Sequence, residues 1–192
     1  MDAEDQKLMH LIERGLTTQR EAHLYLEEAA SLLNERYTPR LIRHCTSCLR
    51  EIEFLAEDVV QTVFAKIING KAVYREREHS SFVAWLYTIA RNECRDRAKE
   101  VKRARRRDET YGRGYASQIP FEDEFAVKEL LILINKLPSQ YREVSLLRRE
   151  GFKWEEIAEI CGISPANARK RGSRAQARLK EVVEADGRGR VD

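Results

Sequence analysis

The sequence predicts an all-α protein of two small helical domains joined by a flexible acidic linker, and three observations support this. Of 192 residues, 35% are charged and only 4 are proline and 9 glycine, which favours a helical protein. Apolar residues recur at three- and four-residue spacing along most of the chain. Residues 108–125 lose all periodicity, and their two glycines, one proline and five acids indicate a linker. We therefore expect an extension over 1–21, domains over 22–107 and 126–184 and a disordered tail over 185–192.

In the first domain, helices are predicted over 5–14, 20–37, 41–49, 55–68 and 82–107. We expect Gly15 to end the first helix, Tyr37-Thr38-Pro39 to break the second and Asn69-Gly70 to end the fourth. The helix over 55–68 carries an apolar stripe opposite a polar face, which by composition alone is an ordinary solvated surface.

The helix over 82–107, capped by Ser80 or Ser81, changes character along its length. Its apolar face continues for five turns, while the opposite face is strongly basic from Arg91 onward, as a phosphate-binding surface requires. Phe82 and Trp85 could stack on unpaired bases, although their spacing favours packing in a core.

Residues 154–171 have the sequence pattern of a helix-turn-helix. Gly162 supplies the turn, and Ser164 followed by Pro165 is a good start for the second helix. From 165 to 180 there are six basic residues and no acidic one, which suits phosphate contacts and base reading in a major groove. This pattern predicts DNA recognition.

Charge is segregated along the chain. Residues 95–107 and 165–180 each carry +6, so subtracting both from the net +3 leaves −9 for the remainder. Two basic patches on an otherwise acidic protein indicate two sites for a polyanion and another surface for a different partner. No stretch is apolar enough to span a membrane, and the acidic start lacks the basic region of a signal peptide, so we expect a cytoplasmic protein without membrane insertion.

Four cysteines are too few and too irregular for a disulfide framework. Cys94 and Cys161 have the positions of small core residues. Cys45 and Cys48 could bind zinc or act in redox chemistry, but no second ligand pair exists elsewhere and two cysteines at this spacing can simply pack. We expect no metal and no cofactor.

No enzyme is expected, because the sequence has no nucleophile and base constellation and no phosphate-binding glycine loop. Glu57 and Asp58 could hold a metal in principle, but no other carboxylates or histidines converge on them. A stand-alone helix-turn-helix regulator is the main alternative, and it would leave the basic helix 82–107 without a purpose.

Four motifs in order resemble the bacterial RNA polymerase sigma factors, specifically the short extracytoplasmic-function type of the sigma-70 family. They are AEDVVQTVF at 56–64, FVAWLYTIARN at 82–92, LPSQYREV at 137–144 and EIAEICGIS at 156–164. The resemblance implies a subunit that binds core RNA polymerase, directs it to promoters and assists promoter melting.

The resemblance also assigns residues to each partner. It implies that the helix over 55–68 docks on the clamp helices of the polymerase β′ subunit, through Glu57, Asp58, Gln61 and Thr62. It implies that the minus-10 promoter element is bound by Arg91, Asn92, Arg95, Lys99, Lys102 and Arg103. It implies that the minus-35 element is read by Ser164, Asn167, Arg169, Lys170, Arg171 and Arg174.

Further implications are a nontemplate base captured by the loop over 74–81, a linker in the polymerase cleft, contact with the β subunit, and an anti-sigma factor that covers the binding faces. Gly172 departs from the family, which usually has a large apolar residue there. We expect this glycine to cost about 1 kcal/mol, to remove a packing anchor and to bend or shorten the recognition helix.

Overall fold

The computed structural model describes residues 3–18, 21–75, 81–107, 133–134 and 136–188. These residues form seven α-helices and one 3-10 helix, with no strand among them. The chain divides into two compact units, Met1–Ala116 and Ser117–Asp192. The all-helical, two-domain prediction is therefore confirmed, while the predicted linker over 108–125 lies outside the described residues.

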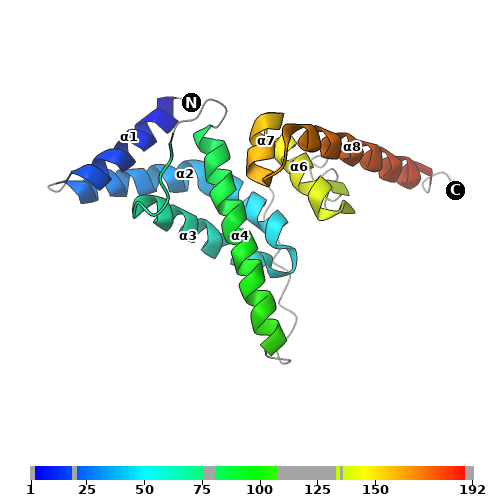
Figure 1. Cartoon of the computed structure of the whole chain (residues 1–192), viewed down its shortest axis with the longest axis horizontal. Coiled ribbons are helices and arrows are strands. Elements are labelled where there is room, and N and C mark those ends of the chain that lie inside the picture. The colour runs from blue at the N-terminus through cyan, green and yellow to red at the C-terminus, as the bar shows by residue number, and fades with distance from the viewer. Residues whose placement is uncertain (1–2, 19–20, 76–80, 108–132, 135, 189–192) are drawn as a thin grey trace. The chain divides into compact units, whose positions relative to one another are not determined.

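The first unit is built around one long central helix, α2 (Ala22–Leu49). Helix α1 (Ala3–Thr17), helix α3 (Ala56–Ile68) and helix α4 (Phe82–Arg107) all pack against α2, and the 3-10 helix η1 (Arg50–Leu55) joins α2 to α3 (Figure 1). The apolar stripes predicted from spacing are the faces that these helices bury, including fully buried Val59, Val60 and Val63 on α3 and Phe82 and Leu86 on α4.

Helix α1 packs on α2 through buried Leu8, Leu11 and Ile12. A buried carboxylate, Asp5, adds polar contacts: the Tyr37 hydroxyl donates to it, and Arg36 Nε lies 3.5 Å from its Oδ1. Burial, followed by the contact with Asp5, raises the pKa of Tyr37, so its hydroxyl stays protonated and donates. The first helix is thus held by both apolar and polar contacts.

The prediction that Gly15 ends the first helix is wrong. Gly15 lies inside α1, which continues to Thr17. A Cβ atom built at Gly15 would lie 2.5 Å from Leu26 Cδ2 of α2. This glycine therefore serves the close approach of two helices rather than a helix end.

The predicted break at Thr38-Pro39 is also wrong, because α2 continues through Pro39. Proline in a helix interior removes a hydrogen bond and costs about 3 kcal/mol. Tyr37 and Leu41 on either side of it are fully buried against the other helices, whereas Pro39 is exposed. Burial of the flanking side chains offsets the local cost.

Other predicted helix boundaries are confirmed, but the tail predicted to be disordered from residue 185 is helical as far as Arg188. Ser81 Oγ accepts from the backbone N–H of Ala84 at 3.2 Å and caps α4. Asn69 and Gly70 end α3, with Gly70 at φ 65°. In the second unit, helix α6 (Ser139–Arg149) follows Pro138 and is closed by Gly151 at φ 93°.

Helix α7 (Trp154–Cys161) and helix α8 (Pro165–Arg188) complete the second unit. Leu137, Tyr141 and Ala175 form a buried cluster against which Leu179 packs. Among the described helices, none is both long and apolar enough to cross a membrane.

We predict that Tyr37→Phe lowers the free energy of unfolding by about 1–2 kcal/mol, because it removes a donor from the buried Asp5 carboxylate. Urea unfolding followed by circular dichroism measures this loss. The control is Tyr25→Phe on the same helix, where the ring packs under Arg14. Equal stability of the two variants would contradict a structural role for the Asp5 contact.

Candidate nucleic-acid interface

The turn between α7 and α8 has the geometry of a helix-turn-helix. Gly162 adopts the left-handed conformation at φ 63°, and the N–H of Ile163 donates to the carbonyl of Ala158 at 2.9 Å. Ser164 Oγ then accepts from the N–H of Asn167 at 3.2 Å and caps α8. The turn, the cap and the second helix predicted from sequence are all confirmed.

Helix α8 buries one side and presents the other. Ala168 and Ala175 are buried in the second unit. The side chains predicted to read the minus-35 element are half-buried at Arg171 and exposed at Ser164, Asn167, Arg169, Lys170 and Arg174. Five of the six are thus accessible to a large ligand such as duplex DNA.

One of these cations has an intramolecular partner that sequence reasoning missed. Arg169 Nη2 lies 2.5 Å from Glu155 Oε1 in the first turn of α7. The two residues are 14 apart in sequence, a spacing that matches no local helix pairing rule. Only the crossing of α7 and α8 brings them together.

The expectation that Gly172 shortens or bends the recognition helix is wrong, since α8 continues to Arg188. Gly172 is buried, and a Cβ atom there would lie 2.4 Å from Trp154 Cη2. The indole of Trp154 occupies the space that a side chain at 172 would need. Arg148 lies over the same indole, 5.0 Å from the ring centroid. Trp154 therefore fills the place that a large side chain at position 172 would occupy, and it packs against α8 there.

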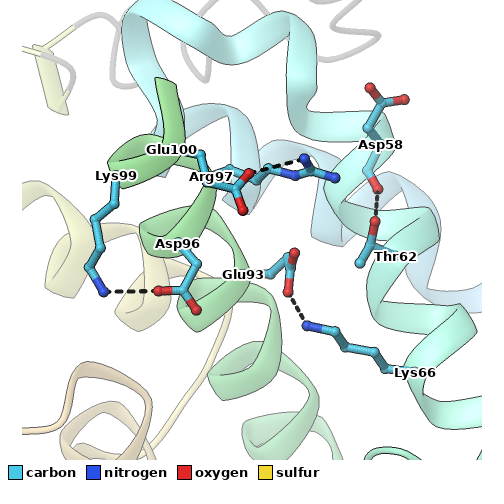
Figure 2. Close-up of polar contacts among 8 residues, drawn as sticks. All are labelled: Asp58, Thr62, Lys66, Glu93, Asp96, Arg97, Lys99 and Glu100. Carbon is cyan, nitrogen blue, oxygen red and sulfur yellow. Dashed lines mark hydrogen bonds and ion pairs between the residues drawn. The ribbon is translucent and has the colours of Figure 1, made fainter. Parts of the chain in front are cut away.

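Helix α3 presents the polar face predicted to meet polymerase. Glu57, Asp58 and Gln61 are exposed, and Thr62 is half-buried. Thr62 Oγ1 donates to the backbone carbonyl of Asp58 at 2.8 Å, as Figure 2 shows. The Thr62 hydroxyl is thus engaged with its own helix, and the two carboxylates in the first turn define the face.

The basic side chains predicted to bind the minus-10 element lie along α4. Arg91 is half-buried, and Asn92, Arg95, Lys99, Lys102 and Arg103 are exposed. Lys99 Nζ pairs with Asp96 Oδ1 at 2.9 Å, and this contact lowers the pKa of the Asp96 carboxyl. Arg97 Nη1 lies 3.2 Å from Glu100 Oε2 (Figure 2).

A further carboxylate on α4 connects it to α3. Glu93 is nearly buried, with 12% of its side chain exposed, and it forms an ion pair with Lys66 of α3. Figure 2 shows the two side chains pointing toward one another between the helices. Lys66 lies one turn after Thr62, so the pair joins the helix with the acidic face to the helix with the basic face. Sequence reasoning had assigned Glu93 no role.

An apolar pocket of about 330 Å³ lies where α1, the end of α3 and the segment 72–74 meet α4. Its wall includes Tyr74 and Trp85, whose ring centroids are 5.5 Å apart. Phe82 is fully buried and packs against both rings, so the core interpretation of Phe82 is confirmed. Trp85 is only half-buried and lines the pocket.

The structure brings Cys94 of α4 beside the Cys45 and Cys48 pair of α2, a proximity that the sequence did not indicate. Cys94 is close enough to both thiols for their interactions to shift its pKa, and Cys48 Sγ lies 3.7 Å from His44 Nε2. All the cysteines are free thiols. Within the part of the chain that the structure describes, no three His, Cys, Asp or Glu side chains are arranged to hold a metal ion.

Comparisons with known proteins agree with this geometry. The family model "Sigma-70 region 2" matches residues 33–107, and "Sigma-70, region 4" matches residues 128–179. The RNA polymerase sigma factor CarQ of Myxococcus xanthus is 31% identical over 163 residues, covering 82% of this chain and 90% of CarQ. The ECF RNA polymerase sigma factor SigM of Bacillus subtilis is 32% identical, covering 67% of this chain and 79% of SigM.

Solved structures show the same fold. The sigma factor RpoE of Bartonella quintana, in complex with the anti-sigma factor NepR, is 25% identical with a TM-score of 0.65, covering 81% of this chain and 97% of that one. CnrH, in complex with the cytosolic domain of CnrY, is 22% identical with a TM-score of 0.60, covering 94% of this chain and 99% of CnrH.

The chain therefore belongs to the sigma-70 family, the non-enzymatic subunits that bind core RNA polymerase and direct it to promoters. Within that family it is a sigma factor of the extracytoplasmic-function type, with regions 2 and 4.

We predict that Gly172→Ala destabilises the protein by about 1–3 kcal/mol, because the new methyl group collides with Trp154. In a Trp154→Ala background the same change should instead stabilise it by about 1 kcal/mol, the ordinary advantage of alanine over glycine in a helix. Urea unfolding of the wild type, the two single variants and the double variant measures the change in the free energy of unfolding in each background. Stabilisation by Gly172→Ala in both backgrounds would contradict the packing explanation.

We also predict slow alkylation of Cys48 and Cys94 in the folded protein at neutral pH. The hydrogen bond with Cys94, followed by burial, raises the pKa of Cys48, and the hydrogen bond with Cys45 is the main cause that raises the pKa of Cys94. Because the thiolate is the reactive form, alkylation should accelerate as pH increases. Mass spectrometry after iodoacetamide treatment, with unfolded protein as control, tests this. Equally fast labelling of the folded and unfolded protein at neutral pH would refute it.

Proposed function

We propose that the two units divide promoter recognition, with the first binding core polymerase and the minus-10 element and the second reading the minus-35 element. The observation that carries the proposal is the placement of an acidic face on α3 and a basic face on α4 within one packed unit, linked by the Lys66 and Glu93 ion pair. One unit can therefore hold a protein partner and a polyanion on different faces.

The polymerase surface that we propose is the polar face of α3, formed by exposed Glu57, Asp58 and Gln61 and half-buried Thr62. By resemblance to the family, its partner is the clamp helices of the β′ subunit, and the second unit contacts the β subunit. An exposed pair of carboxylates favours a basic partner surface and accelerates encounter with it. Neither carboxylate is needed to stabilise the first unit through a buried contact, since both are exposed.

The minus-10 surface that we propose is the exposed side of α4, from Arg91 to Arg103. Phosphate contacts by these cations supply affinity that depends on salt. Melting then needs no catalysis, because binding energy for unstacked bases and single-stranded DNA offsets the lost base pairing. Tyr74 and Trp85 border an apolar pocket of about 330 Å³ that is also lined by Ala72 and Val73, a suitable environment for an extruded base.

The minus-35 surface that we propose is the exposed side of α8. Asn167, Arg169 and Lys170 occupy the first turns of that helix, the part of a recognition helix that meets base edges. Arg171 and Arg174 extend the positive charge toward the phosphates. An anti-sigma factor that covers these faces is a further expected partner, since the similar sigma factor RpoE was solved in complex with the anti-sigma factor NepR.

We predict that the double change Glu57→Lys and Asp58→Lys weakens binding to core polymerase at least about tenfold, because it reverses the charge of the docking face. Run-off transcription with bacterial core polymerase on a fragmented genomic library, with sequencing of RNA 5′ ends, first defines the promoters. Affinity for core polymerase and transcription from those promoters are then measured for each variant.

The matched control is Glu27→Lys with Glu35→Lys, which makes the same charge change at exposed positions of α2. The control should bind polymerase like the wild type. Equal loss in both double variants would contradict a specific docking face, and an absence of protein-dependent start sites would contradict the proposal as a whole.

A further inference from the structure

The ion pair between Glu155 and Arg169 places an acidic group inside the proposed minus-35 surface. Glu155 Oε1 lies 2.5 Å from Arg169 Nη2, and both side chains are about half exposed, at 45% and 55%. Glu155 comes from the first turn of α7, and Arg169 from the early turns of α8. The pair therefore spans the two helices of the helix-turn-helix at a position open to solvent.

Stability does not explain this pair well. Ion pairs at such exposure contribute little to folding, because water and salt screen them and two long side chains must be ordered. On a surface that binds a polyanion, a carboxylate is also unfavourable, since it repels phosphate and cancels one cation. The presence of Glu155 at this position therefore indicates that it affects which DNA groups Arg169 contacts.

The geometry suggests that role. A guanidinium carries five N–H donors in a planar fork, and Glu155 contacts it at Nη2. Donors on the rest of the fork remain available for a guanine edge, and the held arginine loses less conformational freedom on binding. A nonspecific duplex, by contrast, offers Arg169 only phosphates, and Glu155 competes with those phosphates for the guanidinium.

We infer that Glu155 is a specificity-determining positioning residue: it holds Arg169 toward the base edges and keeps its charge from strengthening nonspecific DNA binding. This inference rests on the proposed minus-35 role of α8. Glu155 itself need not touch DNA; it acts through Arg169. Removal of the carboxylate should therefore strengthen binding to unrelated DNA and reduce discrimination, rather than weaken binding generally.

The test uses holoenzyme reconstituted from core polymerase and the full chain. Binding is measured to a duplex carrying a mapped promoter and to the same duplex with the upstream element scrambled, over a series of salt concentrations. Glu155→Gln should lower the ratio of the two affinities by about two- to fivefold. It should also steepen the salt dependence for the scrambled duplex by about one unit of slope, because one more cation can meet phosphate.

Glu159→Gln is the matched control, because it removes an equal charge from the same helix without touching the Arg169 pair. A general electrostatic effect would make the two glutamine variants alike and would overturn the inference. In an Arg169→Ala background, Glu155→Gln should have no further effect on discrimination. A persisting effect there would also overturn it, because Glu155 would then act without Arg169.

Failure of the underlying proposal has a different signature. If wild-type holoenzyme bound the two duplexes equally, the minus-35 role of α8 and the inference built on it would both be wrong. If the wild type discriminated but Glu155→Gln discriminated equally well, the inference alone would be wrong. Thermal unfolding of each variant distinguishes these results from misfolding.

Discussion

The burial of apolar stripes from α3 and α4 against α2 is the constraint on which the first unit depends. Val59 and Val63 on one helix and Phe82 and Leu86 on the other are fully buried. Once these side chains face inward, helical periodicity turns the acidic face of α3 and the basic face of α4 outward. The packing of the core therefore determines where the proposed binding faces of this unit lie, because each face is opposite a buried apolar stripe.

The same constraint changes the electrostatic character of α4. A count of charges in the sequence treats the cations of α4 as one basic patch, but three carboxylates on the same helix form ion pairs and interrupt this patch. Asp96 and Glu100 form ion pairs along the helix, whereas nearly buried Glu93 forms its pair with Lys66 of α3. The pairs within one helix are exposed and contribute little to folding, while the Glu93 pair joins the two helices. The basic face is thus attached to the acidic face by a charged contact as well as by packing.

Local rules for glycine succeeded where the residue lies in a turn and failed where it faces another helix. Gly70, Gly151 and Gly162 have positive φ and end helices, as predicted. Gly15 and Gly172 instead lie inside helices, because each accommodates a side chain from a neighbouring helix, Leu26 and Trp154 respectively. Rules based on residue spacing cannot predict such a contact, because the contacting residue is distant in sequence and the direction of its side chain depends on the tertiary structure.

By itself, the sequence determined the helical class, most helix limits in the described residues, the helix-turn-helix and the polarity of each helix face, because these follow from short-range periodicity, caps and turns. The family motifs added the division into regions 2 and 4. Only the tertiary structure decided which charges are paired across helices, as with Glu155 and Arg169, and which thiols meet, as with Cys48 and Cys94. Those contacts join residues far apart in the chain, so they exist only when packing has set the helix crossings.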